Sequence, residues 1–227
     1  MITKTLKTTD GKINISIPSR LTEVTVGQMV EIMAGGLSDV DAISVLSGIH
    51  RDILYTVRNM DQFNVFTEPI NSICHQILND ADNSIKNVPD FILIEGKKIK
   101  VPQTLSVEPV GAFIVARDVV AGEINNHIIK YGEDKWKDNF NPALPSVVKV
   151  LAQYFFCKWS DEPYNEFKAE AFEQKILKLF MVEVFPIAKA FFLNFPDLSI
   201  KRPSYLEEKR QQWRSALALV RLKSSGQ

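Results

Sequence analysis

The chain has 227 residues, of which 45% are hydrophobic, so it can bury a core and is not expected to be globally disordered. Its 27 basic residues balance its 27 acidic residues, which argues against a domain that grips duplex nucleic acid mainly through phosphates. The first residues lack the apolar region of a signal peptide, and charges and Pro186 interrupt the most apolar stretch, residues 177–195. We therefore expect a buried helix there, no membrane span, and reduced, buried thiols at Cys74 and Cys157.

The N-terminal segment has the pattern of a β-hairpin. Ile13, Ile15 and Ile17 alternate with polar residues, as in a half-buried strand. Asp10-Gly11 precedes them and is a turn signal, because glycine accepts the positive φ that a tight hairpin turn requires. Pro18 then ends the strand, since proline cannot donate to a ladder.

A similar hairpin pattern recurs downstream. Residues 91–94 are a strand-like run, Glu95-Gly96 is the turn signal, and residues 97–101 lead to a second proline. The two copies align at an offset of 84 residues, so that one set of four residues matches another: Pro18, Leu21, Val26 and Gly27 with Pro102, Leu105, Val110 and Gly111. The alignment favours an internal duplication. The alternative is a chance likeness between two hairpins that each precede a proline and a helix.

The other expected elements are helices. Thr25 and Gln28 have the spacing of a capping box and predict the helix Val26–Met33, while Ser38 is expected to cap Asp39–Ser47. Further helices are expected, in chain order, over residues 62–79 with a bend or restart at Pro69, and from a cap at Ser106, with Pro109 in the first turn, toward residue 129. Three more are expected from Pro145 through residue 155, from Asp161 to a kink or end at Pro186, and over residues 203–223. The helix from Asp161 carries an apolar stripe predicted to face the core: Phe167, Phe172, Ile176, Leu179 and Phe180.

These elements predict an α+β fold in which helix dominates. It consists of two hairpin-plus-helices repeats followed by a helical C-terminal region. We expect a first domain over residues 1–85 and a second over residues 90–227, which includes the extended helical part. Residues 79–89, rich in Asn, Asp, Ser and Lys, are the expected linker.

No catalytic or metal-binding motif is visible in the sequence. The three histidines lack zinc-ligand spacing, and Cys74 and His75 are adjacent, so they point to different faces of a helix. Glycine-rich phosphate loops and nucleophile elbows are also missing. We expect no catalytic residue, no metal and no cofactor. An enzyme whose site is assembled from residues without a motif is the alternative.

Two regions carry candidate partner-binding residues. Trp136 lies in a charged loop and is expected to be an exposed anchor, since tryptophan is enriched among binding hot spots. The segment after residue 201 has a net positive charge and helical apolar spacing, and it contains Arg210, Trp213 and Arg214. Three interpretations stay open for it: docking on the protein's own body, binding an acidic partner surface, or touching nucleic acid.

The segment 17–32, with Pro18 and the helix start Thr25-Val26-Gly27-Gln28, resembles tail-assembly and minor structural proteins of tailed bacteriophages that infect Bacteroidetes, crAss-like phages among them. Residues 42–49 follow it with a segment of the same kind. The likeness spans roughly residues 10–80, and the second copy departs from it at Pro109, which stands where Thr25 would be matched. It implies a non-enzymatic role in building the virion tail, with no catalytic residue to carry over.

The leading hypothesis is therefore a phage morphogenesis protein that acts by protein–protein contacts, either as an assembly chaperone or as a minor tail or neck component. Its expected partners are phage tail or neck proteins, and oligomerisation is left open. It would work in the host cytoplasm during assembly or stay in the virion. The alternative is a small nucleic-acid-binding regulator that uses the basic C-terminal helix.

Overall fold

The structure is a computed structural model that describes residues 1–80, 88–101, 109–138 and 140–193. Within these ranges helices dominate, and the strands form two separate antiparallel hairpins, which confirms the expected α+β class. The elements of the N-terminal half are β1 (Ile2–Thr8), β2 (Gly11–Ile17), η1 (Leu21–Glu23), α1 (Val26–Met33), α2 (Asp39–Ser47), α3 (Arg51–Leu54), η2 (Met60–Phe63) and α4 (Asn64–Asp80). Those of the C-terminal half are β3 (Phe91–Ile94), β4 (Lys97–Lys100), α5 (Val110–Tyr131), α6 (Leu144–Ser160), α7 (Glu166–Ile176) and α8 (Met181–Leu193).

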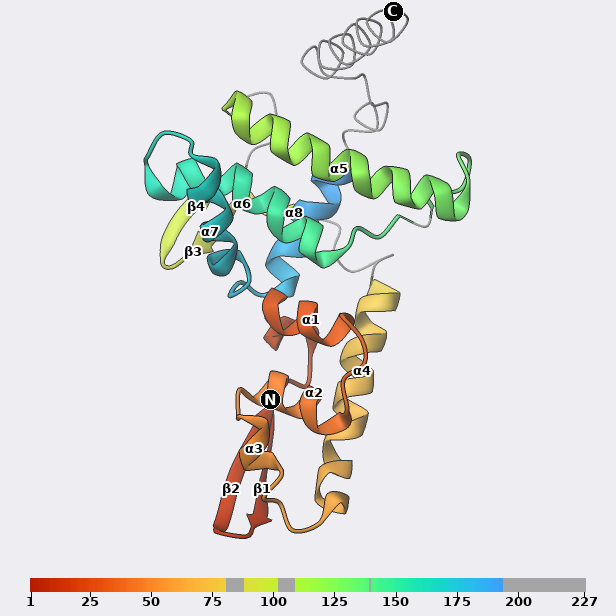
Figure 1. The fold of residues 1–227 in the computed structure, drawn as a ribbon, viewed down its shortest axis with the longest axis vertical. Helices are drawn as coiled ribbons and strands as arrows, with labels where there is room; N and C mark the ends of the chain where they lie inside the picture. The colour runs from red at the N-terminus through yellow and green to blue at the C-terminus, as the bar shows by residue number, and fades with distance from the viewer. Residues whose placement is uncertain (81–87, 102–108, 139, 194–227) are drawn as a thin grey trace, which may run out of the picture.

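In the N-terminal half, α4 runs along one side and α2 contacts both α4 and β2 (Figure 1). Strand pairing runs from Ile2 opposite Ile17 to Thr8 opposite Gly11, so the loop is Thr9-Asp10, one residue before the predicted turn. The hairpin buries its aliphatic side chains against the helices. α4 continues through Pro69, where the sequence predicted a bend or a restart.

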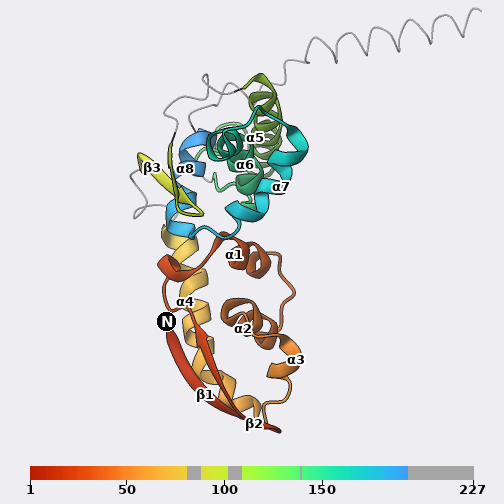
Figure 2. The same ribbon diagram turned by 90° about the vertical axis from the view of Figure 1, so that its left-hand side faces the viewer.

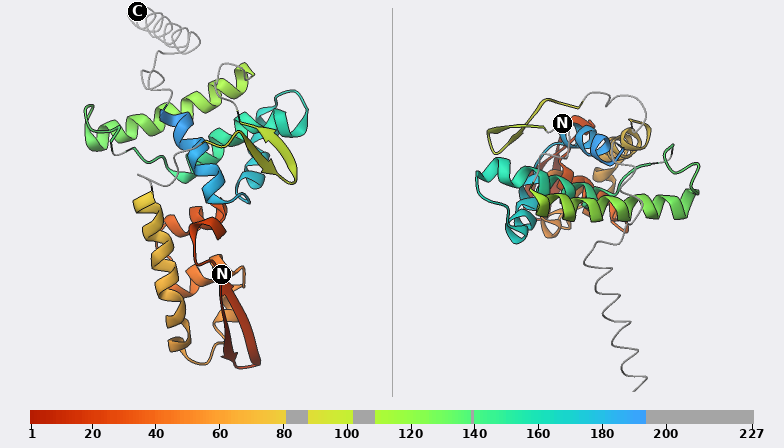
Figure 3. Two further views of the ribbon diagram at one scale, coloured as in Figure 1. Left: turned by 180° about the vertical axis from the view of Figure 1, so that it is seen from behind. Right: turned by 90° about the horizontal axis from the view of Figure 1, so that it is seen from above.

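In the C-terminal half, α6 is the central helix, and every residue from 150 to 156 is buried. α5 and α7 pack along it, and β4 contacts it from the side. Figure 3, seen from behind and from above, places the β3–β4 hairpin at the periphery of this half. The long α5 lies across the end of the molecule farthest from β1 and β2 (Figure 1).

The two halves meet where α1 begins (Figure 2). The N–H of Val26 donates to the Leu179 carbonyl at 2.8 Å, and the N–H of Gly27 donates to the Leu177 carbonyl at 2.8 Å. The N–H of Met181 returns a bond of 3.0 Å to the carbonyl of Val24. These bonds satisfy the first free N–H groups of α1, which a helix cannot satisfy from within. The capping box of Thr25 and Gln28 satisfies the next, as predicted.

The structure confirms the predicted bounds of α1 and α2, including the Ser38 cap. The helix predicted from Asp161 to Pro186 is wrong, because the chain leaves the helix after Ile176 to pair with α1 and restarts as α8, which contains Pro186. The predicted core stripe is also wrong at its ends, since Phe167 is 80% exposed and Phe180 is exposed as well. The helix predicted over residues 203–223 lies outside the described residues. No helix in the described ranges combines the length and apolarity needed to cross a bilayer.

Candidate protein-binding surface

Trp136 is not the exposed anchor that the sequence predicted, because it is only 6% exposed. Its ring packs edge-on against Phe140, with centroids 5.5 Å apart, and Phe140 in turn lies 5.9 Å from the ring of Phe192 in α8. The loop after α5 therefore folds back onto the core and takes its tryptophan with it. The other predicted binding residues, Arg210, Trp213 and Arg214, lie outside the described residues, and their roles stay predictions.

The clearest exposed apolar surface on a strand is the outer face of the β3–β4 hairpin. Glu95 and Gly96 have φ values of +49° and +80°, which is the conformation of a two-residue type I′ turn. The turn fixes the pairing, so Phe91 lies opposite Lys100 and Leu93 opposite Lys98. These four side chains share one face, which we call the outer face, and Phe91 and Leu93 are 46% and 56% exposed. The inner face is buried in the core and consists of Ile92, Ile94 and Ile99.

The turn of this hairpin is fastened to the helices by two ion pairs. Lys97 donates to the Trp159 carbonyl at 2.7 Å and to the carboxylate of Asp161. On the other side of the turn, Lys175 donates to Glu95 at 2.6 Å, and its ammonium also lies 4.5 Å from the centre of the Trp159 ring. The first contact holds the turn against the C-terminal end of α6, and the second holds it against the last turn of α7. The hairpin therefore presents its outer face from a fixed position.

The outer face is positively charged as well as apolar. The ammonium of Lys98 lies 4.1 Å from the centre of the Phe91 ring, within the range of a cation–π contact. Neither Lys98 nor Lys100 forms an ion pair with any residue in the described ranges. Their charges are not neutralised within this part of the fold, so they are available to an acidic partner.

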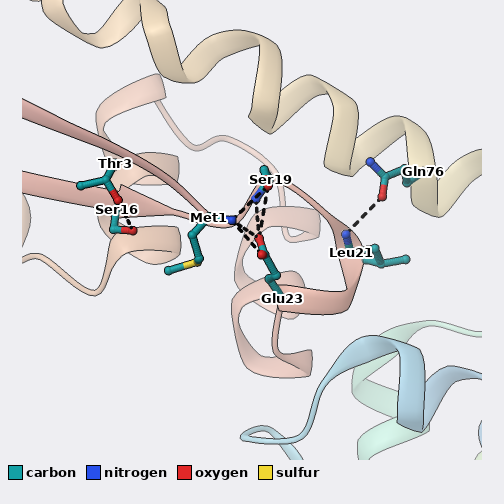
Figure 4. Close-up of polar contacts among 7 residues, drawn as sticks. All are labelled: Met1, Thr3, Ser16, Ser19, Leu21, Glu23 and Gln76. Atoms are coloured by element: carbon teal, nitrogen blue, oxygen red, sulfur yellow. Dashed lines mark hydrogen bonds and ion pairs between the residues drawn. The ribbon is translucent and has the colours of Figure 1, made fainter.

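The first hairpin has an outer face of the opposite character. Thr3 donates to Ser16 at 3.0 Å, and Thr5 donates to Asn14 at 2.6 Å, so these polar groups bond to one another across the strands. Figure 4 shows the first of these pairs. Lys7 and Lys12 lie on the same face and are exposed. A polar face of this kind offers little to a protein partner, because burying it would replace water contacts without covering apolar area.

The base of the first hairpin holds a charged cluster (Figure 4). The Met1 ammonium donates to both carboxylate oxygens of Glu23 at 2.7 Å and to the Ser19 hydroxyl at 3.1 Å. The bond from the ammonium, followed by the bond from the Ser19 N–H, lowers the pKa of Glu23 to about 2. Nearby, the N–H of Leu21 donates to the Gln76 side chain at 3.1 Å, which ties η1 to α4. These groups are satisfied by one another and act in holding the fold.

The described residues do not assemble a metal-ligand set, since no three His, Cys, Asp or Glu side chains there come together. Cys74 and Cys157 are free thiols, but both are half-buried, whereas the sequence led us to expect buried ones. His127 lies in a structural position, with its Nδ1 2.8 Å from the carbonyl of Glu123 and its ring 4.8 Å from that of Phe140.

Phe91 and Leu93 were not among the candidate binding residues predicted from the sequence. Residues 91–94 are apolar throughout, so this strand alone gives no sign of which side chains face outward. The signal lies in the second strand, where Ile99 is the single apolar residue among lysines. With a two-residue turn at Glu95-Gly96, Ile99 pairs with Ile92, and residues 91 and 93 must then share the face of the lysines.

No family model matches the chain, and neither a curated protein nor a solved structure shows significant similarity to it. The outer face of the β3–β4 hairpin is therefore judged by its own geometry and charge.

Proposed function

We propose that this chain is a non-enzymatic morphogenesis protein of a tailed bacteriophage that binds another tail or neck protein through the outer face of the β3–β4 hairpin. The observation that carries the binding surface is the exposure of Phe91 and Leu93 on a hairpin whose turn is fastened by two ion pairs. The phage setting comes from the resemblance of residues 17–32 to tail-assembly proteins.

Physical reasons favour this surface over a random exposed apolar patch. Adjacent large apolar side chains gain free energy when a partner covers them, and aromatic residues are enriched at the centres of interfaces. Ordering a mobile segment opposes binding, and the fastened turn removes much of that cost beforehand. The two free lysines add selection for a partner with negative charge, mainly by guiding its approach and excluding basic surfaces.

We also propose that the two hairpin–helix units arose by duplication at the offset of 84 residues. In support, α1 and α5 both begin with Val and then Gly, and both glycines make close approaches. A Cβ on Gly27 would lie 3.1 Å from the Leu177 carbonyl oxygen, and one on Gly111 would lie 2.5 Å from the Tyr164 ring. In this proposal the outer face of the first hairpin is polar and that of the second is apolar, while both carry lysines. The units are thus proposed to have divided structural and binding roles.

The proposal is tested by capturing the protein with a C-terminal tag from phage-infected cells and identifying what it retains. The wild type is compared with the double variant Phe91→Ser/Leu93→Ser. The matched control is Phe167→Ser/Ile129→Ser, which removes two exposed apolar side chains of the same kinds from α7 and α5. We expect tail or neck proteins with the wild type and the control, and their loss with the hairpin variant.

Two results would count against the proposal. Recovery of no tail, neck or portal protein by the wild type would remove the phage assignment. Equal recovery by the hairpin variant would remove the binding surface. Protein gels of purified particles then distinguish an assembly chaperone, which leaves the particle, from a component that stays in it.

A further inference from the structure

We infer that the partner of the β3–β4 hairpin is an acidic, extended segment that adds as a third strand to the free edge of β3. This inference rests on the proposed function, because it names the partner of the same surface. It is carried by three features: the free main-chain groups of β3, the missing cover along that strand, and the position of the Lys98 ammonium.

The free main-chain groups follow from the register of the hairpin. In an antiparallel pair, alternate residues direct their N–H and C=O groups toward the partner strand and away from it. The two-residue turn makes Ile94 and Lys97 a hydrogen-bonded pair, and the bond of 2.9 Å from the Val101 N–H to the Asp90 carbonyl has the same phase. The groups of Phe91 and Leu93 therefore point away from β4. The residues with exposed side chains are also those with free main-chain groups.

The edge of β3 is uncovered in the part of the chain that the structure describes. β4 packs against α6, whereas β3 has no contact of that extent with any described helix. No hydrogen bond from any described residue outside the hairpin reaches the main chain of Phe91 or Leu93. β3 also lacks the lysine or proline by which proteins commonly block an exposed edge.

In the first hairpin, a neighbouring loop bonds to the free main-chain groups at the end of β1. The N–H of Arg58 donates to the Lys7 carbonyl at 3.0 Å, and the N–H of Thr9 donates to the Thr56 carbonyl at 2.9 Å. The Arg58 guanidinium adds a bond of 2.9 Å to the Thr8 carbonyl. Residues 56–58 thus cap the end of β1. Leu93, which holds the corresponding place beside the turn of the second hairpin, has no such bond to its main chain within the described residues.

The position of Lys98 favours an incoming strand with negative charge. Neighbouring strands lie about 4.8 Å apart, so a third strand beside β3 would be about 10 Å from β4. The Lys98 ammonium, however, reaches diagonally across the hairpin to lie over Phe91, which brings its charge toward the free edge of β3. A carboxylate on the outward side of a third strand would approach this ammonium. Its inward side would continue the buried face of Ile92 and Ile94 and should be apolar.

The inferred partner segment therefore alternates acidic and aliphatic residues. Peptide binding by strand addition takes its affinity from main-chain bonds and its selectivity from alternate side chains. Here the selecting groups are the ammonium of Lys98 on one face and the aliphatic edge of the core on the other.

The test uses the full chain and three synthetic peptides, each labelled with a fluorophore at one terminus. The first alternates Val and Glu, and the second has Lys in place of Glu. The third is the Val-Glu peptide with N-methyl groups on the amides that would bond to β3. Fluorescence anisotropy measures each dissociation constant. Amide hydrogen exchange, followed by NMR, reports on Phe91 and Leu93. We expect the Val-Glu peptide to bind at least about tenfold more tightly than either other probe. It should also slow exchange at Phe91 and Leu93, and its binding should weaken with added salt.

Several outcomes would overturn the inference. Equal binding of the N-methylated peptide, or unchanged exchange at Phe91 and Leu93, would exclude strand addition. Equal binding of the Lys peptide, or no loss of affinity in Lys98→Met, would exclude the acidic partner. If no probe binds while capture from infected cells still depends on Phe91 and Leu93, the inference fails and the proposed function stands. If that capture fails as well, both fall.

Discussion

Gly111 is the position where the smallest change should have a large effect on stability. A Cβ there would lie 2.5 and 2.7 Å from two ring carbons of Tyr164, whereas non-bonded carbons prefer separations of about 3.5–4.0 Å. The ring cannot easily move, because its hydroxyl donates to Gln153 at 2.6 Å and Gln153 is only 2% exposed. Any displacement that relieves the clash therefore breaks a partly buried hydrogen bond.

The magnitude follows from three opposing effects. Alanine favours a helix over glycine by at most about 1 kcal/mol. Overpacking costs about 1–3 kcal/mol, and leaving the buried Gln153 amide without its partner costs about 1–3 kcal/mol. We therefore expect Gly111→Ala to lower the free energy of unfolding by about 2 kcal/mol, although alanine is the better helix former.

Urea unfolding followed by circular dichroism measures the difference, and α5 supplies its own control. Gly122 lies in the same helix, is exposed, and has no heavy atom within 4 Å of a Cβ, so Gly122→Ala should stabilise by up to about 1 kcal/mol. In a Tyr164→Ala background, Gly111→Ala should lose its penalty, since contacting residues are energetically coupled. The reasoning is refuted if Gly111→Ala unfolds at the same urea concentration as the wild type or a higher one.

Gly27→Ala should lower the free energy of unfolding by about 1–2 kcal/mol, because its Cβ would meet the Leu177 carbonyl. Amide hydrogen exchange at Val26 should then become faster, and unchanged exchange would contradict this prediction. The lowered pKa of Glu23, about 2 against an ordinary 4.5, means that its ionised form stabilises the fold above pH 4.5. This contribution is lost as the pH falls toward 2, so acid unfolding of Glu23→Gln should lack that component, and identical pH profiles would exclude it. Lys97→Met should cost no more than about 1 kcal/mol in unfolding, since the pair is partly exposed, but should speed exchange of the hairpin amides; unaltered exchange would show that Lys97 does not fasten the turn.

The sequence predicted correctly those helices whose first and last residues are determined by neighbouring residues in the chain. Thr25 and Ser38 each bond to a backbone N–H three residues on, and glycine at positions 35 and 48 has the positive φ that ends a helix. Such signals need no knowledge of the rest of the fold, which is why the bounds of α1 and α2 were predicted to the residue.

The wrong predictions concern features that are determined by contacts with distant parts of the chain. The break after Ile176 exists because the following carbonyls bond to α1, and nothing between residues 161 and 186 encodes that partner. Trp136 is buried by Phe140 and α8, whereas its immediate neighbours are charged and suggested exposure. For the candidate surface, the turn and the lysines of β4 were sufficient to predict that Phe91 and Leu93 face outward, provided that the pairing of the two strands was worked out first.

The junction at Val26 also bears on the order in which the chain folds during synthesis. The Thr25 cap of α1 is complete as soon as Gln28 has emerged, but the carbonyls of Leu177 and Leu179 emerge only after most of the remaining chain. Domains generally fold from the N-terminus as they leave the ribosome, so the N-terminal half would wait with two open N–H donors at one end. The connection between α7 and α8 is then the segment whose arrival satisfies the first N–H groups of α1.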